Sequence, residues 1–206
     1  MKKAVVVSLA LACLAIVASR DLSAEVGVKI GGSFAKFNWT TPEPTDIVWG
    51  YLPFVAGGLF ASVNLGALAI EPELLVVRAG ARYASEGDRL EFLFTYIQAP
   101  VLLKLSASPR GSVNPFLAVG GYGAYLYRAQ GVLVLGTERT TDDLIDDYKR
   151  SDFGVVASVG FGFRLRGVVI SIEGRYNLGL VNIVKNPAAG ESLKNRSLVA
   201  LIGIGF

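Results

Sequence analysis

Hydrophobic and polar residues alternate most regularly in two adjacent segments late in the chain, residues 153–165 and 168–177. A period of two residues predicts a β-strand in each. The polar side is rich in glycine and in opposite charges, whereas the apolar side carries aromatic residues near the strand ends. This combination is typical of a strand with lipid on one side and a narrow polar interior on the other. In the second segment the apolar side holds Ile170, Ile172, Gly174, Tyr176 and Leu178, and the other holds Val169, Ser171, Glu173, Arg175 and Asn177.

Eight segments carry this period: residues 26–37, 51–64, 67–78, 90–105, 115–128, 153–165, 168–177 and 197–206. Several exceed the roughly 9–11 residues that cross a bilayer at a tilt. Because lipid cannot satisfy the open edge of a sheet, the strands must close into a ring. The pattern therefore predicts an all-β fold: an eight-stranded antiparallel up-and-down transmembrane β-barrel.

The charged face of these strands must point inward, because an Arg or Lys turned to lipid at mid-membrane costs about 2–4 kcal/mol. Paired carboxylates such as Glu71 and Glu73 could perform acid–base chemistry or bind a cation. The alternative is an internal ion-pair network, since eight strands leave just enough room for side chains and buried charges must be paired. We expect the network, which would plug the interior. Its predicted members are Lys29, Glu71, Glu73, Gln98, Lys104, Arg164, Glu173 and Arg175.

Short connections alternate with long ones, as expected for a barrel with turns at one end and loops at the other. The short ones are residues 64–66, 106–114 and 166–167, and the long ones are 38–50, 79–89, 129–152 and 179–196. Aromatic residues gather at both ends, which favours two interfacial belts over the core of a soluble barrel. Phe37, Trp39, Trp49, Tyr51, Phe92, Phe94, Tyr125, Tyr127, Phe153 and Tyr176 lie beside the long loops, and Phe116, Phe163 and Phe206 lie toward the other rim.

The loop at 129–152 is the most acidic segment of the chain. A solvated loop that repels its neighbours is the simplest interpretation. Cation bridging to lipopolysaccharide or contact with an external ligand are the alternatives. The spacing lacks the central Gly and closing Glu of an EF-hand. Its acidic residues are Glu138, Asp142, Asp143, Asp146, Asp147 and, at its end, Asp152, against Arg139, Lys149 and Arg150.

The N-terminal residues have the pattern of a targeting segment. Lys2 and Lys3 precede a 15-residue run that is apolar except for Ser8, followed by small residues. This layout predicts a secretory signal peptide over residues 1–24, cleaved after Ser19 or Ala24, and a barrel domain over 25–206. A membrane-anchoring helix would need about 20 apolar residues.

Charge and composition exclude several functions. Cleavage after residue 24 lowers the net charge from +3 to +1 and removes the single cysteine, and no basic run remains for nucleic acid. The chain has no histidine, which excludes Ser-His-Asp and Cys-His catalysis and His-containing metal sites. We expect no enzyme activity and no cofactor.

Four segments together resemble a known family. EPELLVVRAGARY (71–83), YIQAPVLLKL (96–105), NPFLAVGGYGAYL (114–126) and IEGRYNLGLVNI (172–183), with the terminal LIGIGF, are similar in order and spacing to the PorT-type outer-membrane β-barrel family, small porin-like barrels of the OmpX and OmpA kind. The resemblance implies a Gram-negative outer membrane. It also implies that Phe206 is the terminal aromatic recognised by the barrel-assembly machinery. A role in secretion does not transfer on fold resemblance alone.

These observations predict a non-enzymatic integral outer-membrane protein with both ends of the mature chain in the periplasm. We expect an envelope structural or surface-interaction role through its external loops. A narrow passive channel for small solutes and an accessory of a protein-secretion apparatus are the alternatives. The expected partners are outer-membrane lipid or lipopolysaccharide, the assembly machinery and other envelope proteins, with no nucleic acid.

Overall fold

The computed structural model describes residues 23–40, 52–85 and 88–206 as nine β-strands and their connections. The strands are β1 (Ser23–Thr40), β2 (Leu52–Leu65), β3 (Leu68–Ser85), β4 (Asp88–Ser106), β5 (Val113–Leu135), β6 (Glu138–Asp143), β7 (Ser151–Leu165), β8 (Val168–Gly179) and β9 (Ser192–Gly205). Residues 1–22 lie outside these ranges, so the signal peptide and its cleavage point stay predictions. No helix within the described ranges is long and apolar enough to cross a membrane.

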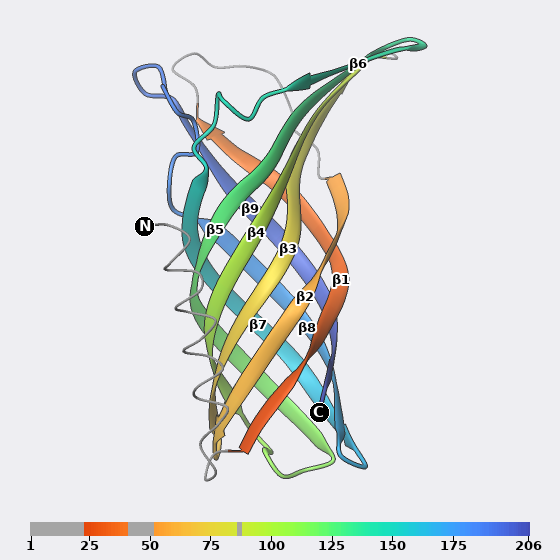
Figure 1. The fold of residues 1–206 in the computed structure, drawn as a ribbon, viewed down its shortest axis with the longest axis vertical. Coiled ribbons are helices and arrows are strands. Elements are labelled where there is room, and N and C mark those ends of the chain that lie inside the picture. Colours follow the sequence, from red (N-terminus) through yellow and green to blue (C-terminus); the bar gives the residue numbers. More distant parts are fainter. Residues whose placement is uncertain (1–22, 41–51, 86–87) are drawn as a thin grey trace.

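Eight of the strands form a closed antiparallel ring in the order β1, β2, β3, β4, β5, β7, β8, β9 (Figure 1). β9 returns to β1, where Phe206 N donates to Val26 O (2.9 Å) and Val26 N donates to Phe206 O (3.2 Å). The remaining strand, β6, pairs only with β5 and stands outside the ring. The predicted fold class, an eight-stranded up-and-down barrel, is confirmed.

The period of two residues decides which side chains face outward. In β7, buried and exposed positions alternate from Ser151 to Gly162. The outward positions are apolar and strongly exposed, as in Ile30 (63%), Val55 (70%) and Leu117 (58%). So much exposed aliphatic surface around a closed ring is the surface that hydrocarbon covers in a membrane barrel.

One end of the barrel is closed by short turns. β7 and β8 are joined by Arg166 (φ 46°) and Gly167 (φ 92°). Positive φ at both central residues is the type I′ hairpin turn, whose twist matches that of the strands. The last residue, Phe206, lies at this end, which places it on the side that membrane barrels turn toward the periplasm (Figure 1).

At the opposite end of the barrel, the prediction of two long loops at residues 79–89 and 129–152 was wrong. β3 and β4 pair continuously up to Ser85 and Asp88, and β5 runs on to Leu135 before turning back as β6. The β4–β5 register shifts between Thr95 and Tyr96, where β5 contains one extra residue, Tyr127. Beyond such a bulge, side chains at alternate positions swap between the inward and outward faces. The period of two residues is therefore broken, and the sequence alone does not reveal that the strand continues. Figure 1 shows the resulting sheet of β3, β4, β5 and β6 projecting beyond the ring. We call it the outer sheet.

Candidate functional site

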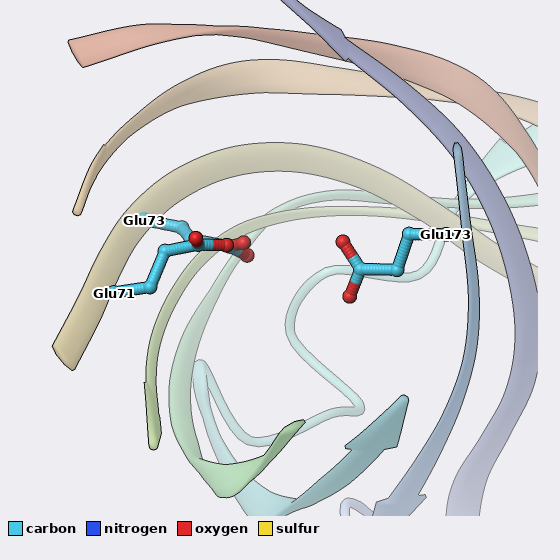
Figure 2. Close-up of side chains that lie close together, drawn as sticks. All are labelled: Glu71, Glu73 and Glu173. Atoms are coloured by element: carbon cyan, nitrogen blue, oxygen red, sulfur yellow. The ribbon is translucent and has the colours of Figure 1, made fainter. Parts of the chain in front are cut away.

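The barrel interior contains a compact cluster of charged side chains from four strands, β1, β3, β4 and β8. Lys29 of β1 donates from Nζ to Glu71 Oε1 (2.7 Å), Glu73 Oε1 (2.6 Å) and Glu173 Oε2 (2.8 Å). Glu71 and Glu73 come from β3 and Glu173 from β8, and Figure 2 shows their carboxylates facing one another across the lumen. One ammonium group therefore ties opposite walls of the barrel together.

Two further cations complete the cluster. Arg175 grips Glu73 with two parallel hydrogen bonds, Nη1 to Oε2 (2.6 Å) and Nη2 to Oε1 (2.9 Å), and also donates from Nη2 to Glu173 Oε1 (2.7 Å). Lys104 Nζ donates to Glu71 Oε2 (3.0 Å). Three carboxylates thus face three cations, and the cluster is formally neutral. This pairing is what a buried ionic group needs, because an unpaired charge would carry the full desolvation penalty.

Aromatic rings flank the two lysines. The Lys29 ammonium lies 5.1 Å from the centroid of Phe60, and that of Lys104 lies 4.2 Å from the centroid of Phe116. Both distances fit a cation–π contact. The assignment of Phe116 to an interfacial belt was therefore wrong: its ring is buried in the lumen, because residue 116 falls on the inward face of β5.

The same carboxylates are the one group in the described ranges whose arrangement could hold a metal ion. One oxygen from each of Glu71, Glu73 and Glu173 lies within 4.8 Å of the others. The Lys29 ammonium, however, is hydrogen-bonded to all three. A lysine of the chain itself therefore fills the position that a cation would take.

Below the cluster, toward the short turns, lies a small polar cavity of about 40 Å³. Lys104 and Arg164 line it, as does Glu25, which sequence reasoning did not select. Glu25 shares the inward face of β1 with Lys29, so the period did contain its signal. Arg164 is exposed at the rim and donates from Nη2 to Pro109 O (3.3 Å) instead of joining the central ion pairs. The cavity has room for water molecules.

Above the cluster lies a second polar layer, centred on Asp152. Asn195 Nδ2 donates to Asp152 Oδ2 (2.9 Å) and to Tyr96 Oη (3.0 Å), and Tyr122 Oη donates to Asp152 Oδ2 (3.3 Å). Gln98 lines a pocket of about 20 Å³ together with Tyr96, Tyr122, Asp152 and Asn195. Counting Asp152 with the acidic loop was wrong, because it is the second residue of β7 and points inward.

An apolar lid closes the outer mouth of the barrel. The segment after β6 and the one after β8 cross the opening side by side, with Lys149 N donating to Ile183 O (2.8 Å) and a β-bridge between Tyr148 and Val184. Tyr148 packs edge-on against Phe94 at 4.6 Å between ring centroids. Burial, with Asp147 and Glu191 nearby, raises the pKa of the Tyr148 hydroxyl.

The prediction that Phe94 belongs to the outer aromatic belt is wrong, because its ring is fully buried beneath this lid. Tyr125, Tyr127, Phe153 and Tyr176 do face outward. Phe92, also predicted in the belt, is partly buried against the same apolar cluster as Phe94, so its assignment was wrong too. Phe37, Trp39, Trp49 and Tyr51 belong to the belt prediction too, but their side chains lie outside the described residues.

The acidic residues of the outer end do not converge on one site. Glu138, Asp142 and Asp143 lie on β6, and Asp146 and Asp147 lie in the segment that follows. All five are exposed. Arg150 approaches Asp146 at 3.9 Å, but a pair with so exposed a carboxylate contributes little. This end of the molecule is a solvated acidic surface.

The fold and its interior define a class: a small membrane-spanning barrel with a filled lumen and a sheet that extends from one mouth. The sequence profile described as "Outer membrane protein beta-barrel domain" matches residues 18–185. The chain belongs to this family, and it is an outer-membrane β-barrel protein.

Similar chains are found among solved structures. OprG from Pseudomonas aeruginosa is similar at 10% identity, with 89% of this chain and 95% of that chain covered and a TM-score of 0.53. Neisserial surface protein A (12%, 91% and 100%, TM-score 0.49) and Ail of Yersinia pestis (12%, 89% and 99%, TM-score 0.41) also match. Identities this low show fold alone. No curated protein matches the chain.

Proposed function

We propose that this outer-membrane barrel is a non-enzymatic protein with an envelope structural or surface-interaction role, carried by the parts that project beyond the membrane. One observation supports the proposal above all: the lumen is filled at successive levels, by the charged cluster, by the Asp152 layer and by the apolar lid. A barrel with a blocked interior has its outer surfaces left for contact with other molecules.

The outer sheet is the surface best suited to such contact. All six residues of β6 are exposed, and no strand of the described ranges pairs with its second edge. A free strand edge offers a row of backbone donors and acceptors to a partner chain. The acidic side chains on β6 favour a partner with basic groups opposite this edge.

A precise deletion tests this role. Gly131 and Asp142 are paired across the β5–β6 hairpin, so residues 132–141 can be replaced by Asn-Gly without changing the register. The variant should keep the heat-modifiable gel mobility of a folded barrel. A photo-crosslinking residue at exposed Thr140 should give discrete adducts in native membranes, whereas one at Ser108, exposed beside a short turn, should give none.

Adducts at Thr140 should be competed away by an excess of the unlabelled protein but not by the shortened variant. Absence of adducts at Thr140, or equal competition by the shortened variant, would contradict a role for the outer sheet. The identity of the captured protein also tests the secretion-accessory alternative that the PorT-type resemblance suggests.

Conductance separates the channel alternative from this proposal. The wild-type protein in planar bilayers should show no stepwise currents, because ion pairs span the lumen between opposite walls. Steady currents that change on altering Lys104 or Arg175 would favour a channel.

We also propose that the barrel-assembly machinery recognises Phe206, whose side chain is 67% exposed at the end of the ring. Its replacement, Phe206→Ala, should reduce the amount of assembled barrel in cells while leaving the stability of refolded protein nearly unchanged. A normal yield in cells would contradict this recognition.

A further inference from the structure

The outward face of β3, β4 and β5 changes abruptly from apolar to basic. Val76, Ile97 and Tyr125 form one row across the three strands, and all are exposed as lipid-facing side chains are. The next outward row consists of Arg78, Thr95 and Arg128, in which Arg78 pairs with Thr95 and Thr95 pairs with Arg128. The Tyr127 bulge is what brings Arg128 into this row, because it adds one residue to β5 just below it.

Both arginines of the row are exposed. Neither has an ion-pair partner within the part of the chain that the structure describes. The arginines farther out on the same sheet differ: Arg82 and Arg89 donate from Nε toward the Glu91 carboxylate at 3.0 and 3.2 Å. Within the described residues, the Arg78–Thr95–Arg128 row is therefore a place on this face where neither arginine is paired with a carboxylate.

The height of the row matches the outer boundary of the hydrocarbon. Ten residues separate Leu68, at the short-turn end of β3, from Arg78. At about 3.3 Å per residue and a tilt of about 40°, this is a rise of about 25 Å, the height of the apolar band in outer-membrane barrels. The guanidinium groups thus lie where acyl chains meet headgroups. Tyr125 and Tyr127 beside them are the aromatic residues expected at that boundary.

The row also has the shape of an anion cradle. Arg78 and Arg128 are two strand spacings apart, roughly 10 Å between backbones, with the Thr95 hydroxyl between them. Two guanidinium groups can converge from either side on one group above Thr95. The guanidinium fork matches two oxygens of a phosphate, so the row favours a phosphate group over chloride or an uncharged sugar.

We propose that Arg78, Thr95 and Arg128 bind the phosphorylated headgroup of an outer-leaflet glycolipid of the lipid A type, with its acyl chains lying along the apolar rows below. The lipid would hold the barrel at a fixed height and leave the outer sheet clear of the membrane. This inference rests on the barrel and its register, and is independent of whether the outer sheet contacts a protein.

The test measures lipid binding by the full processed chain in mild detergent. The variant Arg78→Gln/Arg128→Gln removes both charges, and Arg110→Gln, an exposed arginine at the short-turn end, is the matched control. The probe is fluorescent diphosphoryl lipid A, with its dephosphorylated form and inorganic phosphate as comparison ligands. Heat-modifiable gel mobility checks that each variant is folded.

We expect the double variant to bind diphosphoryl lipid A about 10- to 100-fold more weakly than wild type, with added salt reducing the difference. Arg110→Gln should bind as wild type does, and dephosphorylated lipid A should bind wild type as weakly as the double variant binds the phosphorylated form. The lipid comparison needs no variant, so it stands even if the double variant does not fold.

Several results would overturn the proposal. One is binding by the folded double variant within twofold of wild type, and another is equal loss in Arg110→Gln. Equal affinity for dephosphorylated lipid A would show that phosphate is not recognised. Full competition by inorganic phosphate at the concentration of the lipid would show a free-phosphate site in place of a lipid site.

Discussion

Removing the Lys29 ammonium should be the most damaging single change in the lumen. In Lys29→Met a side chain of similar length replaces the lysine, and three buried carboxylates lose a hydrogen-bonded cation at once. The formal charge of the cluster falls from zero to minus one. Breaking a buried ion pair by removing one partner costs about 3–5 kcal/mol. Since whole domains are stable by about 5–15 kcal/mol, this is a large share of the total.

Urea titration of protein refolded in lipid vesicles, followed by gel mobility, measures the free energy of unfolding. Lys185→Met is the control, because Lys185 is exposed and its side chain donates to the Asp146 carbonyl alone among the described residues; its effect on the free energy of unfolding should stay within about 0.5 kcal/mol. Lys29→Met/Glu71→Gln restores neutrality and should recover part of the loss. The reasoning is refuted if Lys29→Met is as stable as wild type, or if the double variant is less stable than Lys29→Met.

Three further predictions follow from the interior and the lid. Lys29→Met should gain stability from millimolar Ca²⁺ while wild type does not, because the three carboxylates then lack the ammonium between them; equal responses in urea titrations would contradict this. Gly120→Ala should lower the free energy of unfolding by about 1–3 kcal/mol, because a Cβ there would collide with the Val101 carbonyl oxygen. The adjacent outward Gly121→Ala should cost little, because its Cβ would lie 3.7 Å from the nearest atom. Because the pKa of Tyr148 is raised in the folded state, the stability that its protonated hydroxyl contributes is fully present below the ordinary tyrosine pKa of about 10 and is lost as pH rises through the folded value. Between pH 9 and 11, Tyr148→Phe should therefore lose less stability than wild type. Equal losses of stability in the two proteins would exclude this cause.

The strand faces were predictable from the chain because each strand contains its own period. Lys29, Glu73 and Arg175 each alternate along their strands with apolar residues that face lipid, which is enough to direct the three charged side chains inward. Which of them meet was not predictable. Contact between β1, β3 and β8 depends on the stagger of the whole ring, which no single strand specifies. Gln98 and Arg164 show this limit, because both carry the inward phase of their strands but lie above and below the cluster.

The outer sheet was missed for a different reason. Beyond the ring a sheet is no longer lipid on one side and lumen on the other, so the alternation that marks a spanning strand fades. Ala79, Gly80 and Ala81 are all buried in succession, and the extra residue at Tyr127 inverts the phase of β5. Asp152 could have been placed correctly, because it immediately precedes the outward Phe153 in a strictly alternating strand.

The residues that stabilise the barrel lie apart from the outer sheet, for which we propose the surface role. Glu73 from β3 and Arg175 from β8 join opposite walls, so the cluster braces the cross-section of the ring and by the same contacts blocks it. Charges that brace the barrel cannot also conduct without breaking the pairs that compensate them. Changes in the lumen should therefore alter the free energy of unfolding and leave crosslinking from Thr140 unchanged. Shortening the β5–β6 hairpin should do the reverse, because residues 132–141 lie outside the ring. If one variant of either kind shifted both readouts together, lumen and outer sheet would have to be coupled through the lid, where Tyr148 packs on Phe94 of β4.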